Sequence, residues 1–180
     1  MKVRRINLFG GPGVGKSTTA ARIFAHLKIK NVSVELVSEY VKSWAAMKRP
    51  IRKYDQLYLF GKQQQYEYRW LSHDIEIIVT DSPTFLSTIY AREYVSNEMA
   101  DALITLDNLY EEDYPSLNIY LDRGDNDYKQ EARYQDEGEA RRFDRLIKDG
   151  LKTDGVGRRT VFHLYNDLDG IINEIEGVLE

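Results

Sequence analysis

The chain has 180 residues, of which 30% are charged and 42% hydrophobic, and its formal net charge is −4. This balance is typical of one globular domain, and the negative charge argues against a general nucleic-acid coat protein. The sequence contains no cysteine, so we expect neither disulfides nor thiolate metal sites. It also contains no apolar run near the roughly 20 residues of a membrane span, and no signal peptide fits ahead of the first glycines. We therefore expect a cytoplasmic protein.

Apolar runs and helical periodicities alternate along the chain. We expect strands at about residues 3–9, 32–38, 75–80, 117–121 and 160–164. Helices are expected at 15–28, at 39–72 with a kink near Pro50, from Pro83 to about 113, at 128–151 and at 168–179, where Ile171, Ile172, Ile175 and Leu179 face the core. Strands that alternate with helices form a parallel sheet with right-handed crossovers. The sequence therefore predicts a single three-layer α/β domain over residues 1–180, with a five-stranded parallel sheet and helices on both of its faces.

A complete phosphate-binding loop lies between the first predicted strand and the first predicted helix. Residues 10–18 read Gly-Gly-Pro-Gly-Val-Gly-Lys-Ser-Thr, and the strand–loop–helix context distinguishes such a loop from a chance match. Glycines let the backbone N–H groups turn inward around a phosphate, Lys16 can bridge the β- and γ-phosphates, and Ser17 can offer its hydroxyl to Mg²⁺. We therefore expect binding of ATP with Mg²⁺ through the loop residues Gly10, Gly11, Gly13, Val14, Gly15, Lys16, Ser17 and Thr18.

The class of nucleotide-dependent protein is narrowed by what the chain lacks. It contains no Asn-Lys-x-Asp sequence of the kind with which switch GTPases read their base. Motor and chaperone ATPases usually have further modules, whereas small P-loop domains without them are commonly phosphotransferases. This association favours a P-loop kinase domain.

The region after the second predicted strand resembles the deoxynucleoside kinases and nicotinamide-riboside kinases among the small P-loop kinases. Deoxynucleoside kinases have a glutamate at the end of strand two and a tryptophan five residues later, which correspond to Glu39 and Trp44 in Val-Ser-Glu-Tyr-Val-Lys-Ser-Trp. They have a base-reading glutamine on the following helix and then an arginine, for which this chain offers the run Gln63–Gln65 and Arg69. The resemblance implies that the acceptor is bound by Glu39, Trp44, Gln64 (or one of its two neighbours) and Arg69.

The third predicted strand ends in Thr-Asp-Ser-Pro. Asp81 stands in the place of the family's acidic residue, and Ser82 stands where the family has an arginine. A carboxylate beside the phosphate loop can take the proton of an acceptor hydroxyl or help to hold Mg²⁺ with Ser17. A simple helix N-cap is the alternative for Asp81, and Glu39 could share the role of base or hold a sugar hydroxyl.

The charged region before the fifth predicted strand resembles the lid of nicotinamide-riboside-type kinases. Its Arg133-Tyr134 pair matches part of a motif of that family, which implies a helical lid at about residues 123–150 and a catalytic role for Arg133. Arg141 and Arg142 are further candidates to close over the phosphoryl group, because guanidinium groups bind phosphate in a bidentate manner. Arg141 is also four residues after Glu137, and Arg142 is three residues after Glu139. Both spacings fit ordinary ion pairs on a helix surface.

The segment from Val41 to His73 combines many aromatic residues with seven basic and only two acidic ones. Most of the aromatic side chains are expected in the core, and one or two could stack on an acceptor base. The positive charge favours an acceptor that already carries a phosphate, such as a deoxynucleoside monophosphate, although a solvated helix face would look the same.

These observations lead to one main hypothesis and two alternatives. The main hypothesis is an ATP-dependent nucleoside or nucleotide kinase of nucleotide metabolism, with Lys16, Asp81 and Arg133 as catalytic residues, and it allows for a homodimer. The first alternative is a kinase that acts on a hydroxyl of a modified base in DNA, with the basic segment as the DNA-binding surface. The second is an ATP-hydrolysing switch module that acts on a protein partner.

Overall fold

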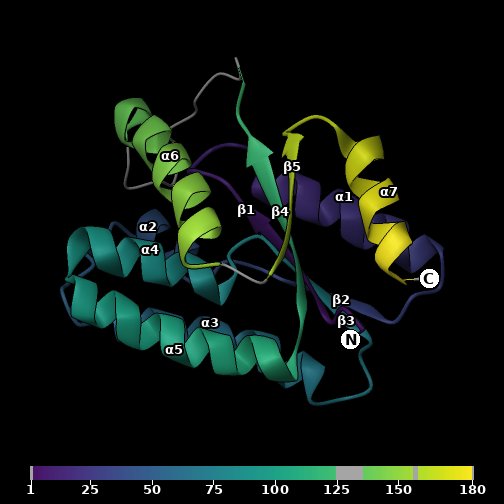
Figure 1. Cartoon of the computed structure of the whole chain (residues 1–180), viewed down its shortest axis with the longest axis horizontal. Coiled ribbons are helices and arrows are strands. Elements are labelled where there is room, and N and C mark those ends of the chain that lie inside the picture. Colours follow the sequence, from purple (N-terminus) through teal and green to yellow (C-terminus); the bar gives the residue numbers. More distant parts are fainter. Residues whose placement is uncertain (1, 125–135, 156–157, 180) are drawn as a thin grey trace.

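A single parallel sheet forms the centre of the protein. The computed structural model describes residues 2–124, 136–155 and 158–179 (Figure 1). The sheet has five strands in the spatial order β2-β3-β1-β4-β5, and every neighbouring pair is parallel. The strands are β1 (Arg5–Phe9), β2 (Val34–Val37), β3 (Ile77–Thr80), β4 (Ser116–Asp122) and β5 (Arg159–Leu164). Because β1 lies between β3 and β4, the phosphate loop that follows β1 emerges at the middle of the sheet's carboxyl edge.

Helices cover both faces of the sheet, which confirms the predicted three-layer α/β fold. Figure 1 shows α1 and α7 on one side of the strands, and α3, α4, α5 and α6 on the other. The helices are α1 (Lys16–Ile29), α2 (Lys42–Ala46), α3 (Asp55–Leu71), α4 (Thr84–Tyr94), α5 (Asn97–Asp113), α6 (Glu137–Thr153) and α7 (Leu168–Leu179). No helix in the described ranges is both long and apolar enough to cross a membrane.

The core is divided by the sheet, since successive side chains of a strand point to opposite faces. Ile6 and Leu8 of β1 belong to the cluster that packs against α1 and α7, and this cluster includes the predicted core residues Ile171, Ile172 and Ile175. Phe9 points to the other face, where it packs with aromatic and aliphatic side chains of α4 and α6. Both faces of β1 are thus fully buried, as expected for the central strand of a parallel sheet.

The predicted helix over residues 39–72 is instead two helices. The short α2 ends at Ala46 and α3 begins at Asp55, with Pro50 in the connection between them. Proline has no backbone N–H and disfavours a helical residue before it, so the helix is interrupted rather than kinked. Lys48 in this connection has a positive φ of 53°.

The predicted helix over residues 128–151 is observed from Glu137 onward. Asp136 caps its first turn, and its side chain accepts a hydrogen bond from the N–H of Glu139. Phe143 and Ile147 on one face of this helix are completely buried. The described part of the region expected to form a lid is therefore a helix packed into the core, while residues 125–135, with Arg133 and Tyr134, lie outside the described residues.

Candidate nucleotide-binding site

The loop after β1 has left-handed backbone angles at three of its glycines. Gly10, Gly13 and Gly15 have positive φ values of 139°, 80° and 103°, as expected from the glycine pattern. A side chain at Gly10 would also collide with its surroundings, because a Cβ atom there would lie 2.8 Å from Cγ1 of Val14 and 2.9 Å from the carbonyl oxygen of Leu121. Helix α1 begins directly after Gly15, so its N-terminus, which attracts anions, opens onto the loop.

Lys16 extends back over the loop. Its ammonium group donates hydrogen bonds to the carbonyl oxygens of Gly10 at 2.8 Å and Gly11 at 3.0 Å. Removal of water by the surrounding protein lowers the pKa of Lys16, and the negative charges of Glu39, Asp81 and Asp144 oppose this effect. The side-chain nitrogen of Lys16 is thus held close to the loop, where phosphate oxygens would bind.

Asp81 is the residue that connects the loop to the neighbouring strands. It follows β3 and is only 5% exposed. One carboxylate oxygen, Oδ2, accepts a hydrogen bond from the hydroxyl of Ser17, and the other, Oδ1, accepts one from the backbone N–H of Glu39 at 3.0 Å. The structure therefore brings together the ends of β1, β2 and β3 and the three predicted site residues that follow them.

The Ser17 hydroxyl and the Asp81 carboxylate are oxygen ligands of the kind that Mg²⁺ prefers. Within the described ranges, no group of three or more histidine, cysteine, aspartate or glutamate side chains could hold a metal ion. A site of one carboxylate and one hydroxyl still fits Mg²⁺, because this ion commonly takes its other ligands from substrate phosphates and water. These two residues would hold the metal.

Of the three consecutive glutamines, Gln63 faces this edge of the sheet. Its Oε1 accepts a hydrogen bond from the N–H of Tyr40 at 3.1 Å, and its Nε2 lies 3.5 Å from the hydroxyl of Thr80, the residue before Asp81. The side chain is 4% exposed. The arrangement therefore favours Gln63, rather than Gln64, as the residue that connects α3 to the site.

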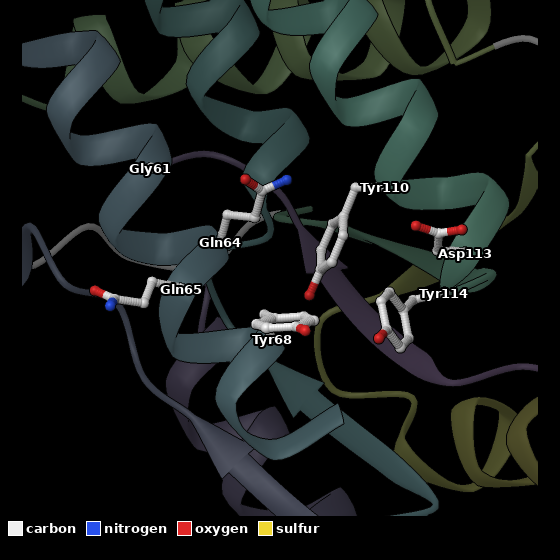
Figure 2. A pocket seen from close by; sticks show the side chains of 7 residues that line it. All are labelled: Gly61, Gln64, Gln65, Tyr68, Tyr110, Asp113 and Tyr114. Carbon is white, nitrogen blue, oxygen red and sulfur yellow. The ribbon is translucent and has the colours of Figure 1, made fainter. Parts of the chain in front are cut away.

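Gln64 lies on a different face of α3. Figure 2 shows it beside Tyr68, opposite Tyr110 and Tyr114 at the end of α5. These residues line an open cavity of about 490 Å³ between the two helices, together with Gly61, Gln65 and Asp113. The structure does not bring Gln64 to the phosphate loop, because adjacent residues of a helix differ by about 100° around its axis.

The structure does not bring Arg69 to the phosphate loop either. Arg69 is six positions after Gln63 on α3. This spacing places it about 9 Å further along the helix and on a different side of the helix axis. The carbonyl oxygen of Leu71, two residues further on, accepts a hydrogen bond from Arg4 just before β1, so this end of α3 approaches the edge of the sheet opposite the loop. The guanidinium group of Arg69 lies over the ring of Trp70, 5.2 Å from its centroid.

Trp44 is at the centre of an aromatic cluster near the end of β2. It is 2% exposed, its ring stacks on Tyr58 with a centroid distance of 5.9 Å, and Tyr40 lies edge-on at 6.2 Å. The guanidinium carbon of Arg49 is 3.4 Å from the centroid of the indole ring. The ring of Trp44 is therefore packed inside this cluster, and the more exposed rings of Tyr40 and Tyr58 are its accessible part.

The structure describes two of the three arginines predicted to belong to the lid. Arg133 lies outside the described residues. Arg141 pairs with Glu137 at 3.0 Å, the surface pair expected from the sequence. Arg142 pairs with Glu93 of α4 instead of Glu139. Both of these arginines of α6 are thus engaged with surface carboxylates, one on α6 and one on α4.

Arg123 and Asp144, two residues that sequence reasoning missed, also contact the loop. Arg123 follows β4, and its Nη2 donates a hydrogen bond to the carbonyl oxygen of Pro12 at 2.7 Å. Asp144 of α6 accepts a hydrogen bond from the N–H of Gly11 at 2.8 Å and pairs with Arg123 at 2.8 Å. The position of Arg123 after a strand next to β1 could have suggested it, whereas Asp144 is one of many charged residues of its helix.

Comparison with known proteins supports the assignment of a P-loop α/β fold. The sequence model of a protein family described as an AAA domain matches residues 5–162. A search of curated proteins gave no match. The structure is similar to that of NadR protein in complex with NR, with a TM-score of 0.75 and 14% sequence identity. The similarity covers 98% of this chain and 52% of that one, so this chain spans about half of the NadR chain.

Two further structures extend the comparison. A structure of NadR protein with NAD and AMP-PNP has a TM-score of 0.72 and 14% identity, over 98% of this chain and 49% of that one. Deoxyadenosine kinase from M. mycoides with bound dATP has a TM-score of 0.63 and 19% identity, over 97% of this chain and 98% of that one. At these identities the likeness concerns the fold, which is that of a small P-loop kinase resembling the nucleoside kinases.

Proposed function

Since the chain belongs to the family of AAA domains and has the fold of small P-loop kinases, we propose that it transfers the γ-phosphate of ATP to a hydroxyl group of a nucleoside or nucleotide. The observation that carries this proposal is the contact of Asp81 with the loop. A buried carboxylate that is bonded to Ser17 and adjacent to Lys16 provides a proton acceptor at the place where the phosphates would bind. The same carboxylate could also help Ser17 to hold Mg²⁺, so the transfer experiment below decides whether it serves as a base.

In the proposed reaction, the oxygen of the acceptor hydroxyl attacks the γ-phosphorus of ATP. The bond from this phosphorus to the oxygen that bridges it to the β-phosphate breaks, ADP leaves, and the hydroxyl proton passes to Asp81. Lys16 stabilises negative charge on the phosphate oxygens, and Mg²⁺, when bound, supplies further neutralisation of that charge. Glu39, whose N–H holds Asp81 at 3.0 Å, orients the acceptor hydroxyl. Arg133 remains our proposal for an arginine that closes over the phosphoryl group.

The residues around Gln63 support an acceptor that contains a base. The amide group of Gln63 lies on the same side of the sheet as Asp81, and the partly exposed rings of Tyr40 and Tyr58 lie nearby. The amide of Gln63 is itself engaged with Tyr40 and Thr80, so it would position this part of the site, while a partly exposed aromatic ring could stack on the face of a base. The exposed side chains of Lys42 and Lys48 around this cluster favour an acceptor that carries a phosphate, such as a deoxynucleoside monophosphate.

The proposal is tested with γ-labelled ATP and Mg²⁺ against nucleosides, nucleoside monophosphates, nicotinamide riboside and short DNA. Lys16→Ala is the control for contaminating kinases, because it removes the charge next to the phosphates. We expect label on a nucleoside or nucleotide with the wild-type protein only. Label on DNA would favour a polymer acceptor, and label released only as free phosphate would contradict the kinase function and favour the ATP-hydrolysing switch.

A further inference from the structure

A carboxylate from α6 is bonded to the phosphate loop. Oδ1 of Asp144 accepts a hydrogen bond from the backbone N–H of Gly11 at 2.8 Å, and Oδ2 is paired with Nε of Arg123 at 2.8 Å. The side chain of Arg123 is 3% exposed and that of Asp144 is 15% exposed. Removal of one partner from an ion pair with so little access to water strongly destabilises a protein, because the other charge stays buried without a partner.

Arg123 extends the same contact to the next residue of the loop. Its Nη2 donates a hydrogen bond to the carbonyl oxygen of Pro12 at 2.7 Å. The pair therefore holds one backbone donor and one backbone acceptor of two successive loop residues. Neither of these groups belongs to Lys16 or Ser17, so the pair can hold the loop without occupying the residues proposed to contact the phosphates and the metal.

The close approach of α6 depends on a glycine in the loop. A Cβ atom at Gly11 would lie 2.3 Å from Oδ1 of Asp144 and 2.6 Å from the carbonyl oxygen of Ala140. Real Cβ atoms do not approach other atoms so closely, and the carbonyl oxygen belongs to the backbone of a packed helix. Any side chain at position 11 would thus separate the loop from α6.

Helix α6 offers a fixed support for this contact. The hydroxyl of Tyr120 on β4 donates a hydrogen bond to the backbone carbonyl oxygen of Asp144 at 2.9 Å. The neighbouring Phe143 and Ile147 are completely buried. The backbone of Asp144 is therefore held by the sheet and the core. Its carboxylate connects this fixed backbone to the loop through the hydrogen bond from Gly11.

We infer that Asp144, together with Arg123, is a positioning residue that keeps the phosphate loop in its nucleotide-binding conformation. The inference rests on the proposed function, because it takes the binding of ATP as the task of the loop. A loop that is held before ATP arrives loses less conformational entropy during binding, and affinity rises accordingly. Asp144 acts through the loop backbone and does not itself contact ATP.

The test compares Asp144→Ala and Asp144→Asn with Asp149→Ala, which changes an exposed aspartate of the same helix. Isothermal titration calorimetry of the full chain with ATP and Mg²⁺, without acceptor, gives the dissociation constants. Thermal unfolding without nucleotide reports stability. We expect Asp144→Ala to weaken ATP binding about 10-fold, the equivalent of about 1.4 kcal/mol. Asp144→Asn should weaken it less, because its amide oxygen can still accept from Gly11, and Asp149→Ala should bind as the wild type does.

Wild-type affinity in both Asp144 variants would overturn the inference. So would a lower melting temperature combined with an unchanged dissociation constant at a temperature far below melting, since that result describes a purely structural role. If Asp144→Ala does not fold, Asp144→Asn and Gly11→Ala decide between these outcomes, because Gly11→Ala breaks the same contact from the loop side.

The proposed function and this inference can fail separately. If the wild-type chain binds ATP but transfers phosphate to no acceptor, the kinase function is wrong and the inference is judged on the affinities alone. A wild-type chain that binds no ATP would overturn both.

Discussion

The hydroxyl of Ser17 donates a hydrogen bond to the carboxylate of Asp81, and this contact joins the first turn of α1 to the end of β3. The two residues are far apart in the sequence and meet because β1 and β3 are neighbours in the sheet. The second oxygen of the same carboxylate holds the N–H of Glu39 after β2. A single side chain thus joins three segments of the proposed active site.

Replacement of Asp81 by asparagine should separate chemistry from nucleotide binding. Asparagine keeps an oxygen that can accept from the N–H of Glu39, but it cannot take a proton from an acceptor. We expect turnover to fall by about 100-fold or more, the usual contribution of a general base, while the dissociation constant of ATP measured without Mg²⁺ stays within about threefold of the wild type. Steady-state kinetics and calorimetry measure the two quantities. Unchanged turnover would remove Asp81 from the mechanism, and Asp113→Asn on the surface of α5 is the matched control.

Gln63 and Gln64 form a natural pair for testing the acceptor site. Only Gln63 reaches the residues beside Asp81, whereas Gln64 faces the cavity between α3 and α5 (Figure 2). Gln63→Ala should raise the KM for the acceptor by about 10-fold, because a buried polar partner of the site is lost, with the KM for ATP little changed. Gln64→Ala should leave both KM values near those of the wild type. Equal effects of the two substitutions on the KM for the acceptor would contradict the assignment of Gln63 to the acceptor site.

Two glycines should respond oppositely to alanine. Gly10 has a φ of 139° and no room for a Cβ atom, so Gly10→Ala should lower the free energy of unfolding by about 2 kcal/mol or more. Gly61 lies within α3, and no atom lies within 4 Å of the position that a Cβ atom would take there. Gly61→Ala should therefore raise the free energy of unfolding by about 0.5–1 kcal/mol through the better helix propensity of alanine. Urea denaturation measures both changes. Stabilisation by Gly10→Ala would contradict the loop conformation.

A buried carboxylate on α3 makes stability depend on pH. Glu67 is completely buried and pairs with Arg5 of β1 at 3.3 Å, while Arg5 also bonds to Glu111 at 2.6 Å. Burial raises the pKa of Glu67 from 4.5 to about 7, and the charge of Arg5 limits this rise. The folded protein therefore binds the proton of Glu67 more tightly than the unfolded chain does.

The sign of the pH effect follows from this raised pKa. The contribution of Glu67 to stability is fully present below about pH 4.5 and is lost as the pH rises through about 7. Between these values the free energy of unfolding should decrease by about 3 kcal/mol, at about 1.4 kcal/mol per pH unit. Urea denaturation at several pH values should show this slope in the wild type and in Glu112→Gln, which changes an exposed glutamate of α5. Glu67→Gln should lack it, and parallel curves for all three proteins would refute the assignment.

The order and type of the main elements could be predicted from the sequence, because each depends on a local pattern. The apolar run before Gly10, the glycine loop and the periodic apolar residues after it determine β1 and α1. The observed helix α7 has the predicted bounds, since its isoleucines repeat at helical spacing. The break around Pro50 lies where the sequence predicts a kink but is longer than a kink, because a proline signals a break without telling how many residues leave the helix.

The details of the site depend on contacts that no local pattern encodes. The choice among three adjacent glutamines needs the rotation of α3, and that rotation is fixed by its packing on the sheet. The buried stripe through Phe60 and Leu71 passes through Gln63 and Glu67, so two polar residues at core positions were a usable signal. The contact of Asp144 with Gly11 joins residues 133 positions apart and could be found only in the folded structure.

The central position of β1 has a consequence for folding of the chain during translation. This strand and its loop are synthesised before both of the strands beside them, because β1 pairs with β3 and β4 rather than with β2. Its second neighbour begins only at Ser116, and the carboxylate that holds Gly11 follows later still, at Asp144. A nascent chain that has not yet reached α6 therefore carries the whole glycine motif without the partners that shape it, and nucleotide binding should be acquired late in translation.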